Sequence, residues 1–203
     1  MFIITFAPIQ ILIFMRKILS IFALLITTIV MGQTQKINLQ ASNLQWEAKK
    51  VIAGGHKGTL AFSKGELIYK DKELVGGSFV VGMNSLTVTD DNLDAKLRAK
   101  LEGHLKSEDF FDTKKFPVAT LVIKKTTKTQ AGYKVEADLT IKGITKTITF
   151  DMLRTTVEGF ASTVVIDRTQ FDIKYGSGSF FSNLGDKAIE DNFTIHTFVL
   201  PNL

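Results

Sequence analysis

Most of this chain alternates apolar with polar residues at a period of two, and that alternation restricts its fold more than any other feature. In residues 44–49, three apolar side chains alternate with Gln45, Glu47 and Lys49. Residues 134–142 repeat the pattern over a longer stretch, with charged residues or threonine at the polar positions. Successive side chains of a β-strand point to opposite faces, so the pattern predicts strands that each bury one face.

Turn signals separate these strands at intervals of about ten residues. The expected turns lie at residues 53–56, 64–65, 70–73, 130–132, 142–143 and 158–159. This spacing predicts an all-β fold, an antiparallel barrel or sandwich of about eight or more strands. Gly76 and Gly77 fall inside a long strand over residues 74–88, where paired glycines indicate a bend or bulge such as a barrel corner needs.

The period changes once along the chain. Leu93, Leu97, Leu101 and Leu105 recur every fourth residue, with basic residues between them. This spacing predicts one short amphipathic helix that lies over a core or over the end of a barrel. Residues 90–92, Asp-Asp-Asn, offer the side chains expected at its N-cap.

Residues 1–32 are expected to be a cleaved secretory signal and not part of the folded domain. Met15, Arg16 and Lys17 supply a start and a positive n-region, and residues 18–30 form an apolar run. This run is shorter than the ~20 residues that a membrane-spanning helix needs. We therefore expect Met15 to be the initiator, residues 1–14 to be an over-called start and residues 33–203 to be one domain. Translation of residues 1–14 would instead favour an uncleaved anchor.

The charge of residues 33–203 is mild and dispersed. Loss of Arg16 and Lys17 with the signal lowers the formal net charge from +5 to +3. The remaining lysines are scattered along the strands, which is typical of solvated outer faces and not of nucleic-acid binding. The chain contains no cysteine, so an exported domain must be stable on packing alone.

No residue pattern predicts catalysis or metal binding. His56, His104 and His196 lie on separate predicted elements, without the spacing of a zinc site. The sequence has neither a cysteine nucleophile nor a Gly-x-Ser-x-Gly turn. Asp167 and Arg168 are expected to form a charge-assisted pair or to cap a strand end at a barrel rim. We therefore expect a protein that is not an enzyme and that has no metal or other cofactor.

Several motifs follow one another along the chain in a distinctive order. The first is His-Leu-Lys-Ser-Glu-Asp-Phe-Phe-Asp at residues 104–112, followed by Phe116 and Pro117. The others lie at residues 56–58, 76–85, 139–146, 166–168, 171–176 and 184–186. Together they resemble the YceI-like family, the lipocalin-like polyisoprenoid-binding proteins, over about residues 36–199.

This resemblance implies an extended antiparallel β-barrel of about eight strands whose lumen holds a long-chain isoprenoid or a related amphiphilic lipid. Ligands of the family include polyprenyl chains, isoprenoid quinones and fatty amides. The implied role is that of an exported carrier or buffer of lipid, in a periplasmic or secreted location. Transient contact with a membrane surface fits this role, and an apolar barrel mouth favours a homodimer.

The lining of such a lumen would be the apolar face of each strand. The candidates are Trp46, Leu60, Phe62, Phe79, Val81, Met83, Leu139, Ile141, Phe150, Phe193 and Ile195, together with Phe110 and Phe111. Phe110 and Phe111 either close the lumen or anchor the helix. We favour anchoring, because adjacent residues point opposite ways on an extended chain.

Two other classes of protein stay open at this point. A structural or stress-related envelope protein would have no ligand, and an enzyme could act on a lipid bound in the lumen. Eight-stranded barrels are either filled by side chains or hold one small ligand, and both kinds show the same alternation. The chain departs from the family at Gly82, where an acidic residue is common. It also departs at Phe180 and Phe181, in a loop expected to be more polar, which would mark a ligand entrance.

Overall fold

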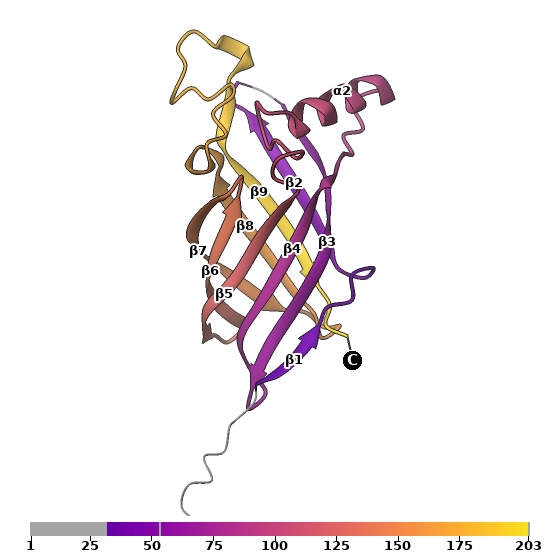
Figure 1. Cartoon of the computed structure of the whole chain (residues 1–203), viewed down its shortest axis with the longest axis vertical. Coiled ribbons are helices and arrows are strands. Elements are labelled where there is room, and N and C mark those ends of the chain that lie inside the picture. Colours follow the sequence, from indigo (N-terminus) through magenta and orange to yellow (C-terminus); the bar gives the residue numbers. More distant parts are fainter. Residues whose placement is uncertain (1–31, 53, 203) are drawn as a thin grey trace, which may run out of the picture. The chain divides into compact units, whose positions relative to one another are not determined.

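Antiparallel strands close into a barrel in the computed structural model, which describes residues 32–52 and 54–202 (Figure 1). The signal predicted at residues 1–32 lies outside the described residues except for Gly32. The strands are β1 (Gln33–Lys36), β2 (Asn43–Lys50), β3 (Gly55–Lys70), β4 (Glu73–Val88), β5 (Val118–Lys128), β6 (Gly132–Ile141), β7 (Ile144–Arg154), β8 (Phe160–Asp167) and β9 (Ile189–Val199). The helical elements are α2 (Ala95–Lys106) and the 3-10 turns η1 (Arg168–Phe171) and η2 (Gly185–Lys187).

The strands β2 to β9 form the closed wall. Hydrogen bonding runs in the order β2, β9, β8, β7, β6, β5, β4 and β3, and β3 pairs again with β2. β1 lies beside β3, as β2 does, and takes the place of β2 along the remaining length of β3. It pairs with β3, and a bridge from Ile37 to Pro201 follows it. The predicted fold, an antiparallel barrel of about eight strands with one short amphipathic helix, is confirmed.

β6 shows how the alternation builds this wall. Its inward residues Tyr133, Val135 and Ala137 are at most 1% exposed, whereas Lys134 and Glu136 between them face solvent. The pleat of a strand sends successive side chains to opposite faces. One face of the strand therefore meets the interior of the barrel, and the other carries the charge.

β3 differs from its prediction. The turn expected at residues 64–65 is wrong, because β3 runs through them without a break. Its pairing with β4 contains a bulge between Phe62 and Lys64 instead. A Cβ atom at Gly65 would lie 2.5 Å from Cδ1 of Ile37, so glycine permits close packing there. The glycine thus accompanies a bulge that bends the strand around the barrel.

The bulge predicted at Gly76 and Gly77 is present in β4. Val75 is the extra residue, next to Gly76, where the register with β3 shifts. A Cβ atom at Gly77 would lie 2.6 Å from the carbonyl oxygen of Glu66. The two strands therefore approach each other more closely here than a side chain would permit.

The end of the barrel near β1 is filled by side chains, and we call it the sealed end. Leu67, Leu74 and Tyr133 belong to one core cluster there and are at most 1% exposed. The Tyr133 hydroxyl donates to Oε2 of Glu73 (2.9 Å) and accepts from Arg154 (2.7 Å) and from the backbone N–H of Leu74 (3.2 Å). Apolar packing and a fully bonded hydroxyl together close this end.

The helix α2 lies at the opposite end, which we call the covered end (Figure 1). Its N-cap is Asp94, whose Oδ1 accepts from the backbone N–H of Leu97 at 2.8 Å. The N-cap predicted at residues 90–92 is therefore wrong. Asp90 lies within 2.9 Å of Nδ1 of His56 and so ties the chain before the helix to β3.

Three of the four predicted leucines of this segment face the barrel. Leu93, Leu101 and Leu105 pack against the cluster formed by Trp46 and its neighbours, whereas Leu97 is 49% exposed. The helix thus covers part of the barrel, as its spacing predicted. Among the described residues, no helix is both long and apolar enough to span a membrane.

Candidate functional site

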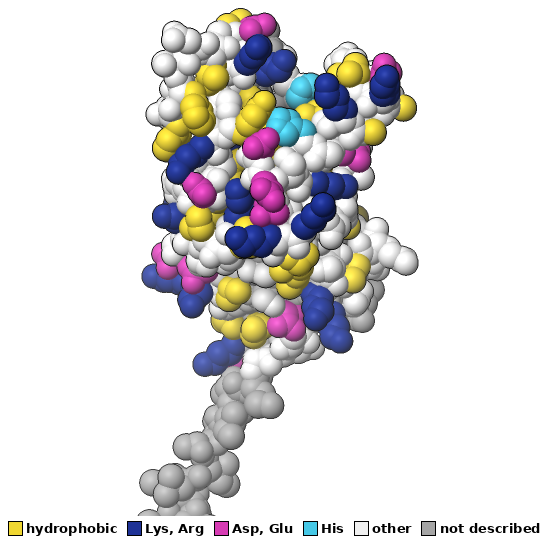
Figure 2. Space-filling model, turned by 45° about the horizontal axis from the view of Figure 1, so that its top comes forward, with side chains coloured by type: hydrophobic (Ala, Val, Ile, Leu, Met, Phe, Trp, Pro, Cys, Tyr) yellow, Lys and Arg dark blue, Asp and Glu magenta, His cyan; other side chains and the backbone are white. Residues whose placement is uncertain are grey.

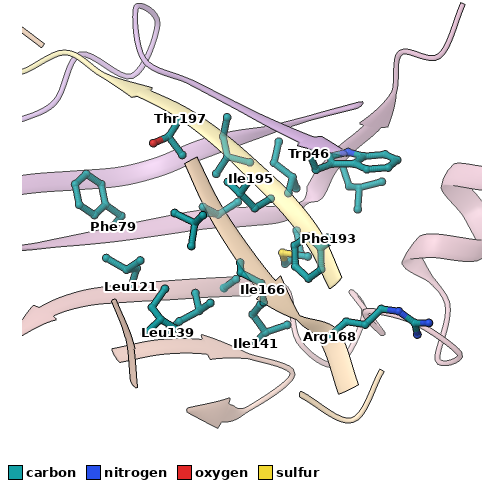
Figure 3. Close-up of a pocket in the computed structure, with 18 of the residues that line it drawn as sticks. Trp46, Phe79, Leu121, Leu139, Ile141, Ile166, Arg168, Phe193, Ile195 and Thr197 are labelled. Carbon is teal, nitrogen blue, oxygen red and sulfur yellow. The ribbon is translucent and has the colours of Figure 1, made fainter. Parts of the chain in front are cut away.

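An apolar cavity of about 180 Å³ lies inside the barrel (Figure 3). Every strand from β2 to β9 contributes to its wall, and Leu105 of α2 covers it at one end. In Figure 3, Phe79 and Thr197 lie at one end of the cavity, and Trp46 and Arg168 lie at the other. The surface is almost entirely carbon. A cavity with such a wall stays dry and accepts apolar molecules.

All thirteen predicted lining residues lie on the wall of this cavity. They are Trp46, Leu60, Phe62, Phe79, Val81, Met83, Phe110, Phe111, Leu139, Ile141, Phe150, Phe193 and Ile195. The strand residues among them point inward because the alternation places them on the inner face. Their contact with a ligand stays a prediction.

Sequence reasoning missed the contribution of β5 and β8. Leu121, Val164 and Ile166 line the cavity, and each occupies an apolar position of an alternating strand, so the signal was present. Ser162 and Thr197 also lie on the wall, opposite each other in the pairing of β8 with β9. Serine and threonine are residue types expected on the outer face of a strand. Only the positions of Ser162 and Thr197 in the alternation could have identified them as lining residues.

Arg168 lies on the wall at the covered end, and its guanidinium points away from the cavity (Figure 3). Its side chain donates to the carbonyl oxygens of Glu190 (3.0 Å), Ile173 (2.8 Å), Tyr175 (2.9 Å) and Ile189 (3.1 Å). Nη2 of Arg168 also lies 3.5 Å from Oδ1 of Asp191, which forms an ion pair without a hydrogen bond. Burial lowers the pKa of Arg168, and the nearby carboxylates oppose that shift. Because its donors already have protein acceptors, Arg168 ties the chain after η1 to β9 and offers no anion site.

Asp167 and Arg168 do not form the mutual pair that was one of their predicted roles. Oδ1 of Asp167 accepts from the backbone N–H of Thr169 and so caps η1, while Arg168 faces Asp191. Burial raises the pKa of Asp167, but hydrogen bonds from Thr169 and Gln170 and the charge of Arg168 together outweigh it and leave the pKa below its ordinary value. The alternative role, capping where β8 ends, agrees with the structure.

Aromatic rings close the covered end. The ring of His104 makes edge contacts with Phe110 at 5.0 Å and with Tyr175 at 4.6 Å between centroids. Phe111 contacts Phe193 of β9 in the same way at 6.5 Å. Phe110 and Phe111 both face the cavity, so the expectation that they point in opposite directions is wrong. They lie in a turn and not in an extended strand, which lets them cover the cavity and anchor the segment together.

The titratable groups outside the cavity form separate pairs. His56 meets Asp90, and His104 lies 3.5 Å from Asp109. The hydrogen bond from His56 is the main cause that lowers the pKa of Asp90. Across residues 32–52 and 54–202, no group of three His, Cys, Asp or Glu side chains could hold a metal ion. The chemistry that the interior of the barrel offers is apolar binding.

Two solved structures share this fold. Burkholderia cenocepacia BcnA aligns with a TM-score of 0.64 at 19% identity, over 82% of this chain and 99% of BcnA. A polyisoprenoid-binding domain from Saccharophagus degradans, implicated in plant cell wall breakdown, aligns with a TM-score of 0.55 at 14% identity. That alignment covers 82% of this chain and 97% of the domain. At these identities the likeness shows the fold alone.

Curated relatives match parts of the sequence. A UPF0312 protein of Staphylococcus aureus (strain USA300) is 36% identical over 99 residues, which cover 44% of this chain and 55% of the relative. A UPF0312 protein of Yersinia enterocolitica is 38% identical over 53 residues, which cover 26% of this chain and 28% of the relative. The chain thus spans about half the length, or less, of these two relatives. Residues 35–199, which include every strand of the closed wall, match the YceI-like domain. The chain therefore belongs to the YceI-like family.

Proposed function

We propose that the barrel binds a long-chain isoprenoid or a related amphiphilic lipid and acts as an exported carrier or buffer of that lipid. The observation that carries this proposal is an apolar cavity lined by all eight strands of the closed wall. The Saccharophagus domain of the same fold, which is a polyisoprenoid-binding domain, supports it. Export to the periplasm or out of the cell is part of the proposal and rests on the sequence of residues 15–32.

The energetics of such binding favour exchange over permanent capture. Each methylene moved out of water contributes about 0.8 kcal/mol, so one five-carbon unit contributes roughly 4 kcal/mol gross. A few units therefore outweigh substantial ordering costs. A lipid in a bilayer is already out of water, so its transfer into the barrel is close to neutral. We expect reversible loading, as a carrier or buffer requires.

The volume of the cavity limits how much of a long ligand it can hold without rearrangement of its wall. A leucine-, isoleucine- and phenylalanine-lined cavity of about 150 Å³ holds benzene. The present cavity of about 180 Å³ therefore accommodates roughly one isoprene unit as it stands. A longer chain requires side chains of the wall to rotate. Met83 and Met152 lie on that wall, and unbranched thioether side chains adopt new rotamers readily.

The polar groups of the site favour an uncharged buried portion of the ligand. Arg168 has protein acceptors for its donors, so it is not available to neutralise an anionic head group. A charge buried without a partner is costly. We therefore expect the hydrocarbon of the lipid to occupy the cavity while any charged head group stays outside the apolar wall.

Mass spectrometry of organic extracts from natively purified protein tests the proposal. A prenyl or similar long-chain lipid in the extract would support a carrier. An extract without lipid would favour a structural envelope protein, and a lipid accompanied by its modified product would favour an enzyme that acts in the barrel. The homodimer stays a separate prediction, which light scattering on the same sample measures.

Two adjacent residues of β8 provide a matched pair of variants for this experiment. Val164 is 8% exposed and lies on the cavity wall, whereas Val165 is 61% exposed on the outer face. Val164→Phe fills part of the cavity, so we expect it to retain about tenfold less lipid than Val165→Phe, in line with the loss of roughly two buried methylenes. Circular dichroism checks that both variants fold. Equal lipid content in the two would contradict the cavity as the binding site.

A further inference from the structure

Two segments that are joined at the covered end each carry a pair of exposed apolar side chains. Val51 and Ile52, after β2, are 58% and 67% exposed, and Phe180 and Phe181, between η1 and β9, are 50% and 51% exposed. The backbone N–H of Val51 donates to the carbonyl oxygen of Ala188 at 3.0 Å, which joins the two segments. We call these four side chains the apolar rim. Large apolar side chains gathered on a surface mark an interaction site.

The apolar rim stands beside the route into the cavity. The sealed end is blocked by Leu67, Leu74 and Tyr133, which are at most 1% exposed. The covered end is closed by connecting segments instead, and Phe111 and Ile189 there line the cavity. Ile189 directly follows Ala188, the residue to which Val51 is bonded. A lipid that enters or leaves at this end therefore passes next to the rim.

Lysines flank both pairs. Lys49 and Lys50 precede the first pair, and the second lies between Lys174 and Lys187. Lys49 pairs with Glu47 at 3.9 Å and Lys174 pairs with Asp172 at 2.7 Å, so the positive charge beside the rim rests mainly on Lys50 and Lys187. Figure 2, in which this end comes forward, shows hydrophobic and basic side chains side by side over it. The rim thus combines exposed carbon with positive charge.

This combination matches the interface of a lipid bilayer. Aromatic and aliphatic side chains enter the boundary between head groups and acyl chains, while lysines meet the phosphates of anionic lipids. We propose that the apolar rim docks the covered end on a bilayer that contains anionic lipid, so that a lipid passes between membrane and cavity without crossing water. The purpose of this docking rests on the proposed lipid binding, but the contact itself does not require a filled cavity.

Flotation with phosphatidylcholine vesicles, with and without phosphatidylglycerol, tests this proposal. The chain that begins at Gln33 contains every described strand and the barrel core, and it omits the apolar residues 1–32 that would confound the measurement. We expect binding that is stronger with phosphatidylglycerol and that weakens as salt screens the lysines. Phe180→Ser and Phe181→Ser each remove one ring from the interface, so each should weaken binding about tenfold.

Val157→Ser is the matched control. Val157 is 59% exposed, as the rim residues are, but it precedes β8 at the sealed end. This variant should float with the vesicles as the parent chain does. A loss of vesicle binding as large as that of Phe180→Ser would overturn the proposal. Unchanged flotation of both phenylalanine variants would also overturn it. So would a self-association that Phe180→Ser abolishes in a chain that binds no vesicles, because the rim would then contact a second copy.

Lipid content separates this inference from the proposed function. Phe180 and Phe181 are not on the cavity wall, so their serine variants should keep their co-purified lipid while they lose vesicle binding. A chain that floats but never carries lipid would contradict the proposed function and support the docking. A chain that carries lipid but never floats would contradict the docking and support the proposed function.

Discussion

Arg168 and Tyr133 are polar side chains buried at opposite ends of the barrel, and each is surrounded by partners. Arg168 meets four carbonyl oxygens and a carboxylate. Tyr133 donates once and accepts twice. A polar group buried without partners costs several kcal/mol, so these bonds are what permits the two side chains to be inside at all. Both residues therefore hold the ends of strands together and do not mark a reactive centre.

Tyr133→Phe should destabilise the sealed end. The change leaves the buried N–H of Leu74 without its acceptor and removes one partner from Arg154, so we expect a loss of about 1–3 kcal/mol in the free energy of unfolding. Denaturant unfolding followed by the fluorescence of Trp46, the single tryptophan, measures this. Tyr175→Phe is the control, because Tyr175 is 45% exposed, and it should change stability by less than about 0.5 kcal/mol. Equal effects of the two variants would contradict the role given to the Tyr133 hydroxyl.

The elements of the covered end are held less firmly than the strands. No residue of α2 is fully buried, and the helix rests on Leu101 and Leu105. The turn that follows it packs through Phe110 and Phe111 on residues of β9 and of the segment after η1. Segments with few buried contacts open at a lower free-energy cost than the core of a protein. α2 and the turn after it are therefore the elements best suited to move when a ligand enters.

Leu105→Ala should speed the release of a bound lipid. Leu105 lies on the cavity wall and packs against the barrel, whereas Leu97 of the same helix is 49% exposed. Removing part of a half-buried leucine costs about 1–2 kcal/mol of packing, so we expect release to be roughly tenfold faster. Transfer of a fluorescent prenyl lipid to vesicles gives the rate. Leu97→Ala should release lipid at the parental rate, and a similar increase in both variants would count against the helix as a cover.

The sequence predicts the inner face of the barrel well and the details of its ends poorly. Leu139 and Ile141 could be placed on the wall because the pleat of a strand converts alternation directly into direction. The N-cap at Asp94 could not be chosen over residues 90–92, since four neighbouring side chains are all good caps. The acceptors around Arg168 could not be predicted either, because the register of β9 places two of them and the fold of the segment after η1 places the other two.

The molecule as a whole is a closed wall with one filled end and one covered end. The strands β2 to β9 pair in a ring, but β7 and β8 pair only where Leu153 meets Ala161 and Arg154 meets Phe160, next to the sealed end, so the facing edges of these two strands are unpaired over the rest of their length. The volume of the cavity depends on how the inner side chains of all these strands fit together, which is a property of the tertiary structure. Alternation could therefore predict which residues face inward. It could not predict that the interior keeps about 180 Å³ of empty space.

Removal of lipid should lower the thermal stability of the whole barrel. A ligand that binds only the folded state at about a hundred times its Kd adds about 2.7 kcal/mol. For a protein of this size that corresponds to roughly 5–10 °C in Tm. Delipidated protein should therefore melt at a lower temperature than native protein and regain its Tm when prenyl lipid is added. Val164→Phe serves as the control and should gain little on addition of lipid. A native Tm that does not fall on delipidation would contradict lipid binding in the barrel.

The pairing of β2 with β9 determines when a newly made chain can complete the barrel. Asn43 of β2 pairs with Phe198 of β9, and Ile37 bridges to Pro201, so the wall closes between the two ends of the chain. Pairings so distant in sequence form slowly. A polypeptide that emerges with its N-terminus first must wait for its last strand, with the edges of β2 and β8 unpaired until β9 arrives. Barrel closure thus cannot precede the synthesis of β9, and a chain that stops before residue 189 is an open sheet prone to aggregate.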